Sequence, residues 1–280
     1  MKTMPENFEK EIFKNASKTY FTSSLFFPKV KRLAVFELYS FVRLADDFVD
    51  DMPQDKKSFY LLKKSYEKKS TANVDSKIGK VLKNIYKLQK KYLIDDLEVN
   101  AFLKSMSMDL NSKNYKHMKD TLDYIYGSAE VIGIMMAKIL ELKPEAYKYA
   151  RYQGRSMQYI NFIRDIEEDI NLGRCYFPQS IRNKYSIKKW NISIRDNPKF
   201  DSFIRDQIET YAKWQKVAKK GWKYIPYRSR IAVMTASDGY NWTARRIHKK
   251  PTIVFNQKIK PSKYRLIYFG IKNTIYGLFI

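Results

Sequence analysis

Hydrophobic residues recur along most of the chain at spacings of three and four, which is the period of an amphipathic α-helix. The pattern is clearest over residues 31–49, 77–93 and 147–170. Glycine and proline number nine each among 280 residues, roughly half of their usual share, which disfavours a hairpin-rich architecture. We therefore predict an all-α fold, a bundle of helices that each bury one face.

Proline and glycine also indicate where two of these helices begin and end. Pro28 is expected near the start of a helix that runs to Asp51, and Pro53 follows its end. Gly173 and Pro178 are expected to end the helix over 147–170. The sequence contains no internal repeat and no linker rich in proline, glycine or serine, which favours one domain over residues 1–280.

The first of these helices is predicted to end in four aspartates, Asp46, Asp47, Asp50 and Asp51. Asp46 and Asp50 share one helical face, as do Asp47 and Asp51, so four carboxylates fall within little more than one turn. Such ligands suit Mg²⁺, which binds through one or two carboxylates plus the oxygens of a substrate phosphate. A solvated acidic helix end would look the same, but the apolar residues between the acids indicate burial beside a core.

A second acidic cluster lies on the helix predicted over 147–170. Asn161, Asp165 and Asp169 are spaced by four and line one face, with Gln158 and Glu168 beside them. The asparagine carbonyl can bind a metal without adding charge. Alone, this pattern also fits a salt-bridged surface helix. Two such clusters in one basic chain favour a shared magnesium site, with Mn²⁺ as an alternative ion.

The chain carries 54 Lys and Arg against 29 Asp and Glu, a formal net charge of +25. This excess attracts polyanions such as nucleic acid, anionic lipid or diphosphates, although a lysine-rich source proteome would also produce it. With only Cys175 and two histidines, an intrachain disulfide is excluded and a Cys/His zinc site is disfavoured. Neither a membrane-spanning run nor a secretion signal is present, so we expect a cytoplasmic protein.

Two facing acidic helices that share magnesium ions would hold and ionise a diphosphate ester, because the metal stabilises the charge of the leaving group. Arg43, Arg164 and Arg174 would donate to the phosphate oxygens. The carbocation left behind requires a dry apolar chamber with aromatic faces. The candidates for its wall are Tyr20, Phe21, Phe26, Phe27, Tyr39, Phe41, Tyr126 and Tyr240.

The sequence resembles the squalene and phytoene synthases, which join two prenyl diphosphates head to head. The motifs that carry the resemblance are SKTYF at 17–21, YSFVRLADDFVD at 39–50, MDL at 108–110, YIYGSAEVIG at 124–133, QYINFIRDIEED at 158–169 and GRCYFP at 173–178. They occur in family order. The resemblance implies the isoprenoid-synthase fold, an all-helical bundle around a central apolar cavity.

The resemblance also implies roles for individual residues. Magnesium would be held by Asp46, Asp50, Asn161, Asp165 and Asp169, with Asp47 in support. Substrate would contact Ser17, Tyr20, Tyr39, Arg43, Gln158, Asn161, Arg164 and Arg174. Tyr126 and Tyr240 are candidates for stabilising the carbocation and relaying protons. In the implied reaction one diphosphate ionises, its cation alkylates the second molecule, and a cyclopropylcarbinyl diphosphate forms and then rearranges.

We expect phytoene formation from two geranylgeranyl diphosphates. The chain is short, carries Gly-Ser-Ala at 127–129 and has no glycine-rich dinucleotide fingerprint for a reductive squalene synthase. Condensation of two farnesyl diphosphates to squalene or dehydrosqualene is the alternative within the family. Outside it, the alternatives are a basic nucleic-acid-binding protein, supported by charge and aromatics alone, and a catalytically inactive scaffold.

The C-terminal region leaves two questions open. Residues 254–258, VFNQK, resemble a terminal basic segment of the family, with Gln257 where arginine is usual and Lys258 one position later. Residues 263–280 mix basic and apolar side chains, which fits both a final core helix and a segment lying on an anionic membrane. The second option implies peripheral attachment to the inner face of a membrane.

Overall fold

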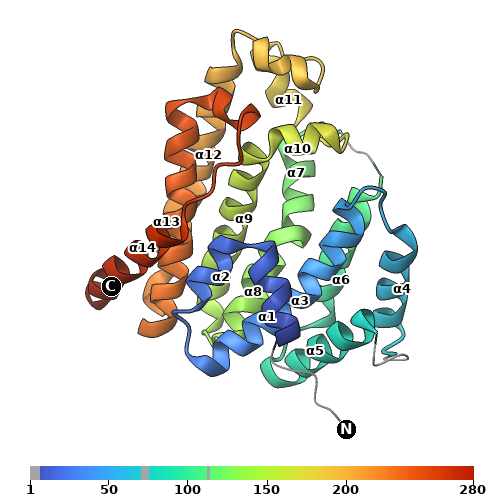
Figure 1. The fold of residues 1–280 in the computed structure, drawn as a ribbon, viewed down its shortest axis with the longest axis vertical. Helices are drawn as coiled ribbons and strands as arrows, with labels where there is room; N and C mark the ends of the chain where they lie inside the picture. Colours follow the sequence, from blue (N-terminus) through green and yellow to red (C-terminus); the bar gives the residue numbers. More distant parts are fainter. Residues whose placement is uncertain (1–6, 71–75, 112–113) are drawn as a thin grey trace.

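The computed structural model describes residues 7–70, 76–111 and 114–280; residues 1–6, which bear on the expected absence of a secretion signal, lie outside it. The all-α prediction is confirmed (Figure 1). In chain order the α-helices are α1 Asn7–Ala16, α2 Lys18–Ser24, α3 Lys29–Asp50, α4 Lys56–Glu67, α5 Lys77–Tyr92, α6 Asp96–Asp109, α7 Met118–Ile125, α8 Val131–Ile139, α9 Tyr147–Arg164, α10 Ile166–Asn171, α11 Gln179–Arg182, α12 Phe200–Lys219, α13 Tyr227–Lys249 and α14 Lys263–Tyr276. A π-helical turn, η1 Tyr126–Glu130, joins α7 to α8.

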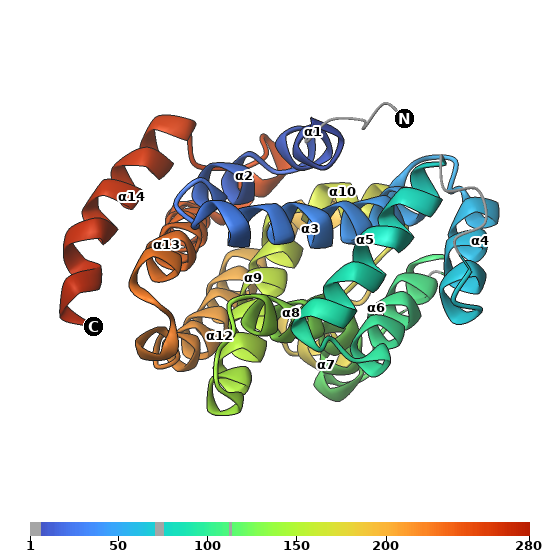
Figure 2. The ribbon, with the colours of Figure 1, turned by 90° about the horizontal axis from the view of Figure 1, so that it is seen from below.

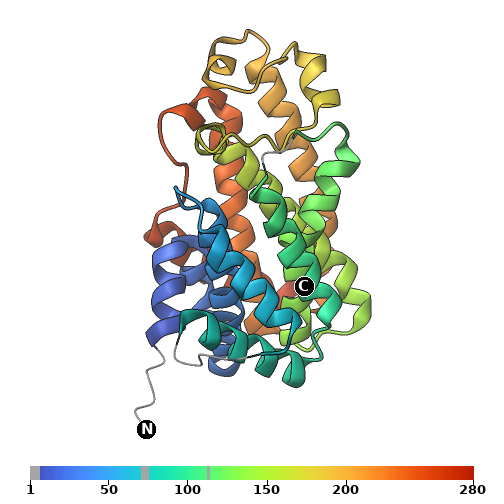
Figure 3. The same cartoon turned by 90° about the vertical axis from the view of Figure 1, so that its right-hand side faces the viewer.

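Helices α9, α12 and α13 run along the long axis of the molecule, with α11 at one end and α5 near the other (Figures 1 and 3). Short 3₁₀ turns connect several helices: η2 Pro144–Ala146, η3 Asn183–Tyr185, η4 Ile192–Asp196, η5 Trp222–Tyr224, η6 Pro251–Phe255 and η7 Gly277–Phe279. Buried side chains form two hydrophobic clusters, one mainly from α1 to α6 and α8, the other mainly from α7 and α9 to α13. The cavity described below is lined by residues of both clusters.

The predicted helix ends are confirmed for α3, which starts directly after Pro28 and ends at Asp50. The helix predicted over 147–170 is interrupted. Helix α9 ends at Arg164 and α10 starts at Ile166, because Asp165 has φ −101° and ψ 20°, outside the helical range. The second acidic cluster therefore spans a break in the backbone.

Helices α8 and α9 meet backbone to backbone. A Cβ atom at Gly133 would lie 2.2 Å from the carbonyl oxygen of Ala150, and one at Gly154 would lie 2.2 Å from that of Ala129. Only glycine permits this approach. Helix α8 is rich in apolar residues and buries Val131, Met135, Ala137 and Ile139 in the core. Across the three described ranges, no helix combines the length and apolar content needed to cross a bilayer.

Candidate active site

A cavity of about 610 Å³ lies where the two hydrophobic clusters meet. Aspartates and arginines from α3, α9 and α10 form one part of its wall, and small and apolar side chains from α8, α9, α12 and α13 form another. Four of the predicted aromatic wall residues line it, namely Tyr20, Phe27, Tyr39 and Tyr240, whereas Phe21, Phe26 and Phe41 pack in the core instead. Phe13, Phe102 and Trp222 also line it and were not predicted.

The first acidic cluster occupies the last turn of α3. Asp46 and Asp50 line the cavity, as does Asp51 directly after the helix, whereas Asp47 does not. Arg43 donates to Asp46 at 2.9 Å and also pairs with Asp47. The side chain of Asp46 is 35% exposed, but that surface faces the cavity rather than bulk solvent. Burial and the nearby Asp50 raise the pKa of Asp46 well above its usual value, despite Arg43.

The second acidic cluster lies on both sides of the break at Asp165. Arg164 donates through Nε to Asp165 at 2.8 Å and also pairs with it through Nη2. Burial acts to raise the pKa of Asp165, but Arg164 and two lysines outweigh it and lower that pKa. Asp169 forms no such pair with any residue that the structure describes, and burial and the charge of Asp165 raise its pKa well above the usual value.

Arg174 connects the two clusters. It pairs with Asp50 and donates to the carbonyl oxygen of Val49 at 2.6 Å, so the loop after α10 is bound to the end of α3. Asp109, at the end of α6, lies beside this arginine and accepts hydrogen bonds from the hydroxyls of Tyr124 at 2.6 Å and Tyr176 at 2.9 Å. Burial raises the pKa of Asp109 to about 6, although the arginine and both hydroxyls oppose the shift.

The donor set fits a hard divalent cation such as Mg²⁺, since it consists of carboxylate and amide oxygens. Asp46 and Asp169 are under-neutralised, and the buried Oδ1 of Asn161 has no hydrogen-bond partner. As they stand, however, no three Asp, Glu, His or Cys side chains of the described chain are grouped closely enough to hold a metal. Arginines contact Asp46, Asp50 and Asp165 instead.

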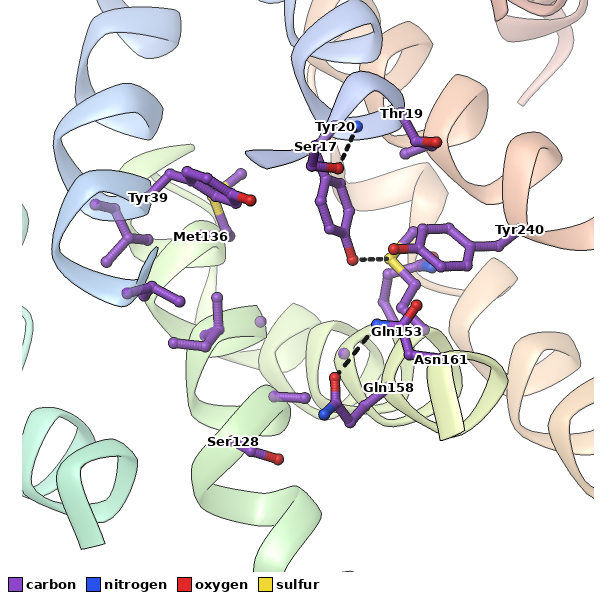
Figure 4. A pocket seen from close by; sticks show the side chains of 18 of the residues that line it. Ser17, Thr19, Tyr20, Tyr39, Ser128, Met136, Gln153, Gln158, Asn161 and Tyr240 are labelled. Atoms are coloured by element: carbon purple, nitrogen blue, oxygen red, sulfur yellow. Dashed lines mark hydrogen bonds between the residues drawn. The ribbon is translucent and has the colours of Figure 1, made fainter. Parts of the chain in front are cut away.

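Tyrosines from three helices surround the space above the second cluster (Figure 4). The ring of Tyr20 lies between those of Tyr240 and Tyr39, with centroids 5.6 and 6.5 Å away. Ser17 caps α2 by accepting from the amide of Tyr20 at 3.3 Å, and the Tyr20 hydroxyl donates to the sulfur of Met157 at 3.6 Å. Gln158 also lines the cavity and accepts from Asn161 at 3.4 Å.

Comparison with known proteins identifies the family of this site. The sequence profile described as squalene/phytoene synthase matches residues 13–265, almost the whole chain. The chain belongs to the squalene/phytoene synthase family. It is 30% identical to a 15-cis-phytoene synthase of Enterobacter agglomerans over 80% of this chain and 79% of that protein. It is 24% identical to a 4,4'-diapophytoene synthase of Staphylococcus haemolyticus over the same shares.

The fold is shared as well. The structure of a dehydrosqualene synthase in complex with a ligand superposes with a TM-score of 0.84 at 19% identity, covering 98% of this chain and 97% of that one. This synthase is therefore a prenyltransferase that joins prenyl diphosphates head to head. Membership of this family disfavours the alternative of a nucleic-acid-binding protein.

The structure places Tyr126, a predicted catalytic residue, outside the cavity. Its side chain is 39% exposed, does not line the cavity, and lies beneath the guanidinium of Arg151, 5.3 Å from the ring centroid. Tyr126 is the first residue of the π-helical turn η1, but its amide still donates to the carbonyl oxygen of Leu122, the regular α-helical bond, so the direction of its side chain is set by α7. Ser128 and Ala129 face the cavity of the synthase instead.

Two lysines of the C-terminal segment border the second cluster. Lys258 pairs with Glu168 and lies 3.7 Å from Asp165, whereas Gln257 does not line the cavity. Of the two candidates for a diphosphate contact, Lys258 is thus the one that lines the cavity, and the contact itself stays a prediction. Lys260 lines the cavity too, and sequence reasoning missed it. Desolvation at the cavity wall, with Arg164 and Lys258 nearby, lowers the pKa of Lys260 to about 8.

The apolar part of the synthase cavity contains two polar side chains with an atom that has no partner. These atoms are the hydroxyl of Ser128 and Nε2 of Gln153. The other amide atom of Gln153 accepts from the indole of Trp222 at 3.4 Å. Both small and large side chains line this part of the cavity, among them Ser23, Ser24, Ala137, Ala150 and Ala232 on the one hand and Leu38, Met136, Leu140 and Trp222 on the other.

Proposed function

We propose that this synthase condenses two molecules of geranylgeranyl diphosphate to phytoene and that it requires Mg²⁺. The observation that carries the proposal is one continuous cavity in which two aspartate clusters and three arginines adjoin an apolar chamber. The charged part suits a diphosphate and the apolar part suits a prenyl chain. The identity to a 15-cis-phytoene synthase supports the choice of substrate.

Asp46, Asp50, Asn161, Asp165 and Asp169 would hold Mg²⁺, which when bound supplies positive charge to the departing diphosphate. Arg43, Arg164 and Arg174 now donate to aspartates. With substrate present they would donate to the phosphate oxygens, for which the planar guanidinium is well shaped.

The chamber would protect the allylic cation once the diphosphate has left. Its apolar wall excludes water, and the ring faces of Tyr20, Tyr39 and Tyr240 attract a cation. Burial raises the pKa of Tyr20 and of Tyr240, so both hydroxyls stay protonated. We propose that the cation then alkylates a double bond of the second substrate and that loss of one proton closes a cyclopropylcarbinyl diphosphate. The second diphosphate would leave as this intermediate rearranges, and loss of a second proton would give the hydrocarbon.

The small residues of the chamber support the C20 substrate. Ser24 on α2, Ala137 on α8 and Ala150 on α9 leave length for a geranylgeranyl chain that larger side chains would fill. Two farnesyl diphosphates are the alternative, favoured by the 24% identity to a 4,4'-diapophytoene synthase.

The test is incubation of the purified protein with C20 or C15 diphosphate, in Mg²⁺, in Mn²⁺ and in EDTA. We expect a C40 hydrocarbon, identified as phytoene by mass spectrometry, from the C20 substrate with Mg²⁺ and none with EDTA. A C30 product from the C15 substrate alone would contradict the chain length. Equal turnover in EDTA would contradict the metal requirement.

A further inference from the structure

The C-terminal helix α14 packs on the body of the protein through one face only. Leu266, Phe269 and Gly270 are buried against α2 and α13, and Gly270 lies directly against the ring of Phe26. Backbone contacts secure this face, since Tyr227 donates to the carbonyl oxygen of Thr274 at 2.6 Å and Arg230 to that of Gly277 at 3.0 Å. In Figure 2 the helix lies at the outer edge of the molecule, beside α13 and α2.

The opposite face of α14 is apolar and exposed. Tyr264, Tyr268, Ile271 and Ile275 are spaced by four, three and four, so they form one stripe along the helix. Of the eighteen exposed large hydrophobic side chains in the described chain, nine fall within residues 264–280. They are Tyr264, Ile267, Tyr268, Ile271, Ile275, Tyr276, Leu278, Phe279 and Ile280. Contiguous exposed apolar surface of this kind marks an interaction site.

Basic and aromatic side chains border the apolar stripe. The guanidinium of Arg265 stacks on the ring of Trp242 at 4.8 Å, and Arg246 lies 5.9 Å from the same ring. Trp242, Tyr264 and Tyr268 also line a shallow groove with Arg245 and Arg265. Tryptophan, tyrosine and arginine next to an apolar surface are typical of the boundary between lipid head groups and acyl chains.

We propose that this face of α14, with the neighbouring Trp242, is a docking surface for an anionic lipid bilayer. An amphipathic helix with one apolar stripe and basic flanks lies in the plane of the interface and binds through buried apolar area plus attraction to anionic lipids. A second copy of the chain would bring its own basic side chains against those of the first, and the two would repel each other in a protein of net charge +25. Charge complementarity thus favours lipid over self-association.

The docking surface lies next to the wall of the cavity. Helix α2 packs between α14 and the cavity, and a Cβ atom at Gly239 would meet both Leu266 of α14 and Thr19 of α2. Thr19 in turn lines the cavity. A bilayer bound at α14 would therefore lie close to the chamber that takes prenyl chains. This last step rests on the proposed function, whereas membrane binding itself does not.

The test is sedimentation of the full-length protein with vesicles of phosphatidylcholine, with or without about 30% phosphatidylglycerol. We expect binding to the anionic vesicles that weakens as salt is raised, because salt screens the basic flanks. The double variant Ile271→Glu/Ile275→Glu should lower the vesicle partition coefficient at least about tenfold, since both side chains would enter the interface. The matched control is Ile192→Glu, which changes an isoleucine that is 52% exposed on η4, against 60% and 61% for the pair.

Three results would overturn the proposal. They are no binding of the wild-type protein to anionic vesicles, equal binding of the double variant and wild type, and a wild-type dimer in sedimentation velocity that the double variant abolishes without any vesicle binding. Circular dichroism and the milder Ile271→Ser/Ile275→Ser variant separate misfolding from loss of docking. Turnover of detergent-dispersed substrate should stay at the wild-type level in both double variants, so a failure of the proposed reaction is distinguishable from a failure of docking.

Discussion

The two acidic clusters of the cavity are balanced by cations in different ways. In the first, Arg43 is shared between Asp46 and Asp47, and the pKa of Asp46 stays raised. In the second, Arg164 pairs with Asp165 alone among the described acids, and the pKa of Asp165 is lowered. Each cluster thus contains one acid with too little neutralisation, Asp46 or Asp169. These two positions are where an added cation would gain most.

The largest expected effect comes from removing one charge from each cluster. Asp46→Asn and Asp165→Asn should each lower turnover by roughly 10²-fold or more, because each removes a ligand of the proposed magnesium site. The measurement is product formation from C20 diphosphate with Mg²⁺. Asp123→Asn, at an exposed position on α7, is the control and should retain full activity. Full activity in either cluster variant would refute the metal assignment.

The same two variants should differ in stability. Asp165→Asn leaves the mostly buried Arg164 without its carboxylate and should cost about 3 kcal/mol in the free energy of unfolding. Asp46→Asn relieves repulsion from Asp50 and leaves Arg43 paired with Asp47, so its stability should equal or exceed that of the wild type. Urea unfolding in EDTA measures both. Equal losses in the two variants would show that the clusters are balanced alike.

Asp109 lies between the clusters and should make stability depend on pH. Its pKa of about 6 in the folded protein exceeds the unfolded value near 4, so its stabilising contribution is present below about pH 4 and is lost as the pH rises through 6. Asp109→Asn imitates the protonated form. From pH 4 to 7 the variant should therefore gain about 3 kcal/mol relative to the wild type. A stability difference that is constant with pH would contradict the assignment.

Lys260 offsets the negative charge of the second acidic cluster and should affect substrate affinity. With a pKa of about 8 it loses its charge as the pH rises from 7 to 9, so the KM for the diphosphate should rise over that range. Lys260→Gln should raise KM by roughly tenfold at pH 7, equivalent to one charge-assisted hydrogen bond, and remove the pH dependence. The control is the exposed Lys188→Gln. A KM profile unchanged by Lys260→Gln would exclude this role.

The smallest expected effect is at Asp47. It tests whether an aspartate that belongs to a cluster in the sequence is for that reason a metal ligand. Its carboxylate pairs with Arg43 and does not line the cavity. Asp47→Asn should therefore change kcat by less than about threefold, within the range of a surface ion pair. A loss as large as that of Asp46→Asn would place Asp47 among the ligands after all.

Much of this site follows from residue spacing. Periodicity and Pro28 give helix α3, and the i, i+4 spacing of Asp46 and Asp50 places both in the cavity wall. Spacing also places Asn161, Asp165 and Asp169 in the same wall, although the helix breaks at Asp165. It gives no signal for Tyr126, whose side chain lies outside the cavity.

Long-range neighbours could not be predicted either. Lys260 lies almost 100 positions after Asp165, and Asp109 gains its importance from Tyr124 and Tyr176, which the fold brings to it. Glu130 also depends on distant partners. Its carboxylate is buried and accepts from Nε of Arg151 at 2.8 Å and from Nε of Arg155 at 2.6 Å, both on α9. Such partners depend on tertiary packing, for which local sequence carries no signal.

The pair between Arg174 and Asp50 joins positions 124 apart in the chain. Contacts of such sequence separation form late, because a long loop must close before they stabilise anything, whereas the helices on either side can form early. During synthesis Asp50 therefore leaves the ribosome long before Arg174, whereas Arg43 leaves together with Asp46 and Asp47. The part of the cavity wall that Arg174 completes should be among the last parts of the molecule to assemble.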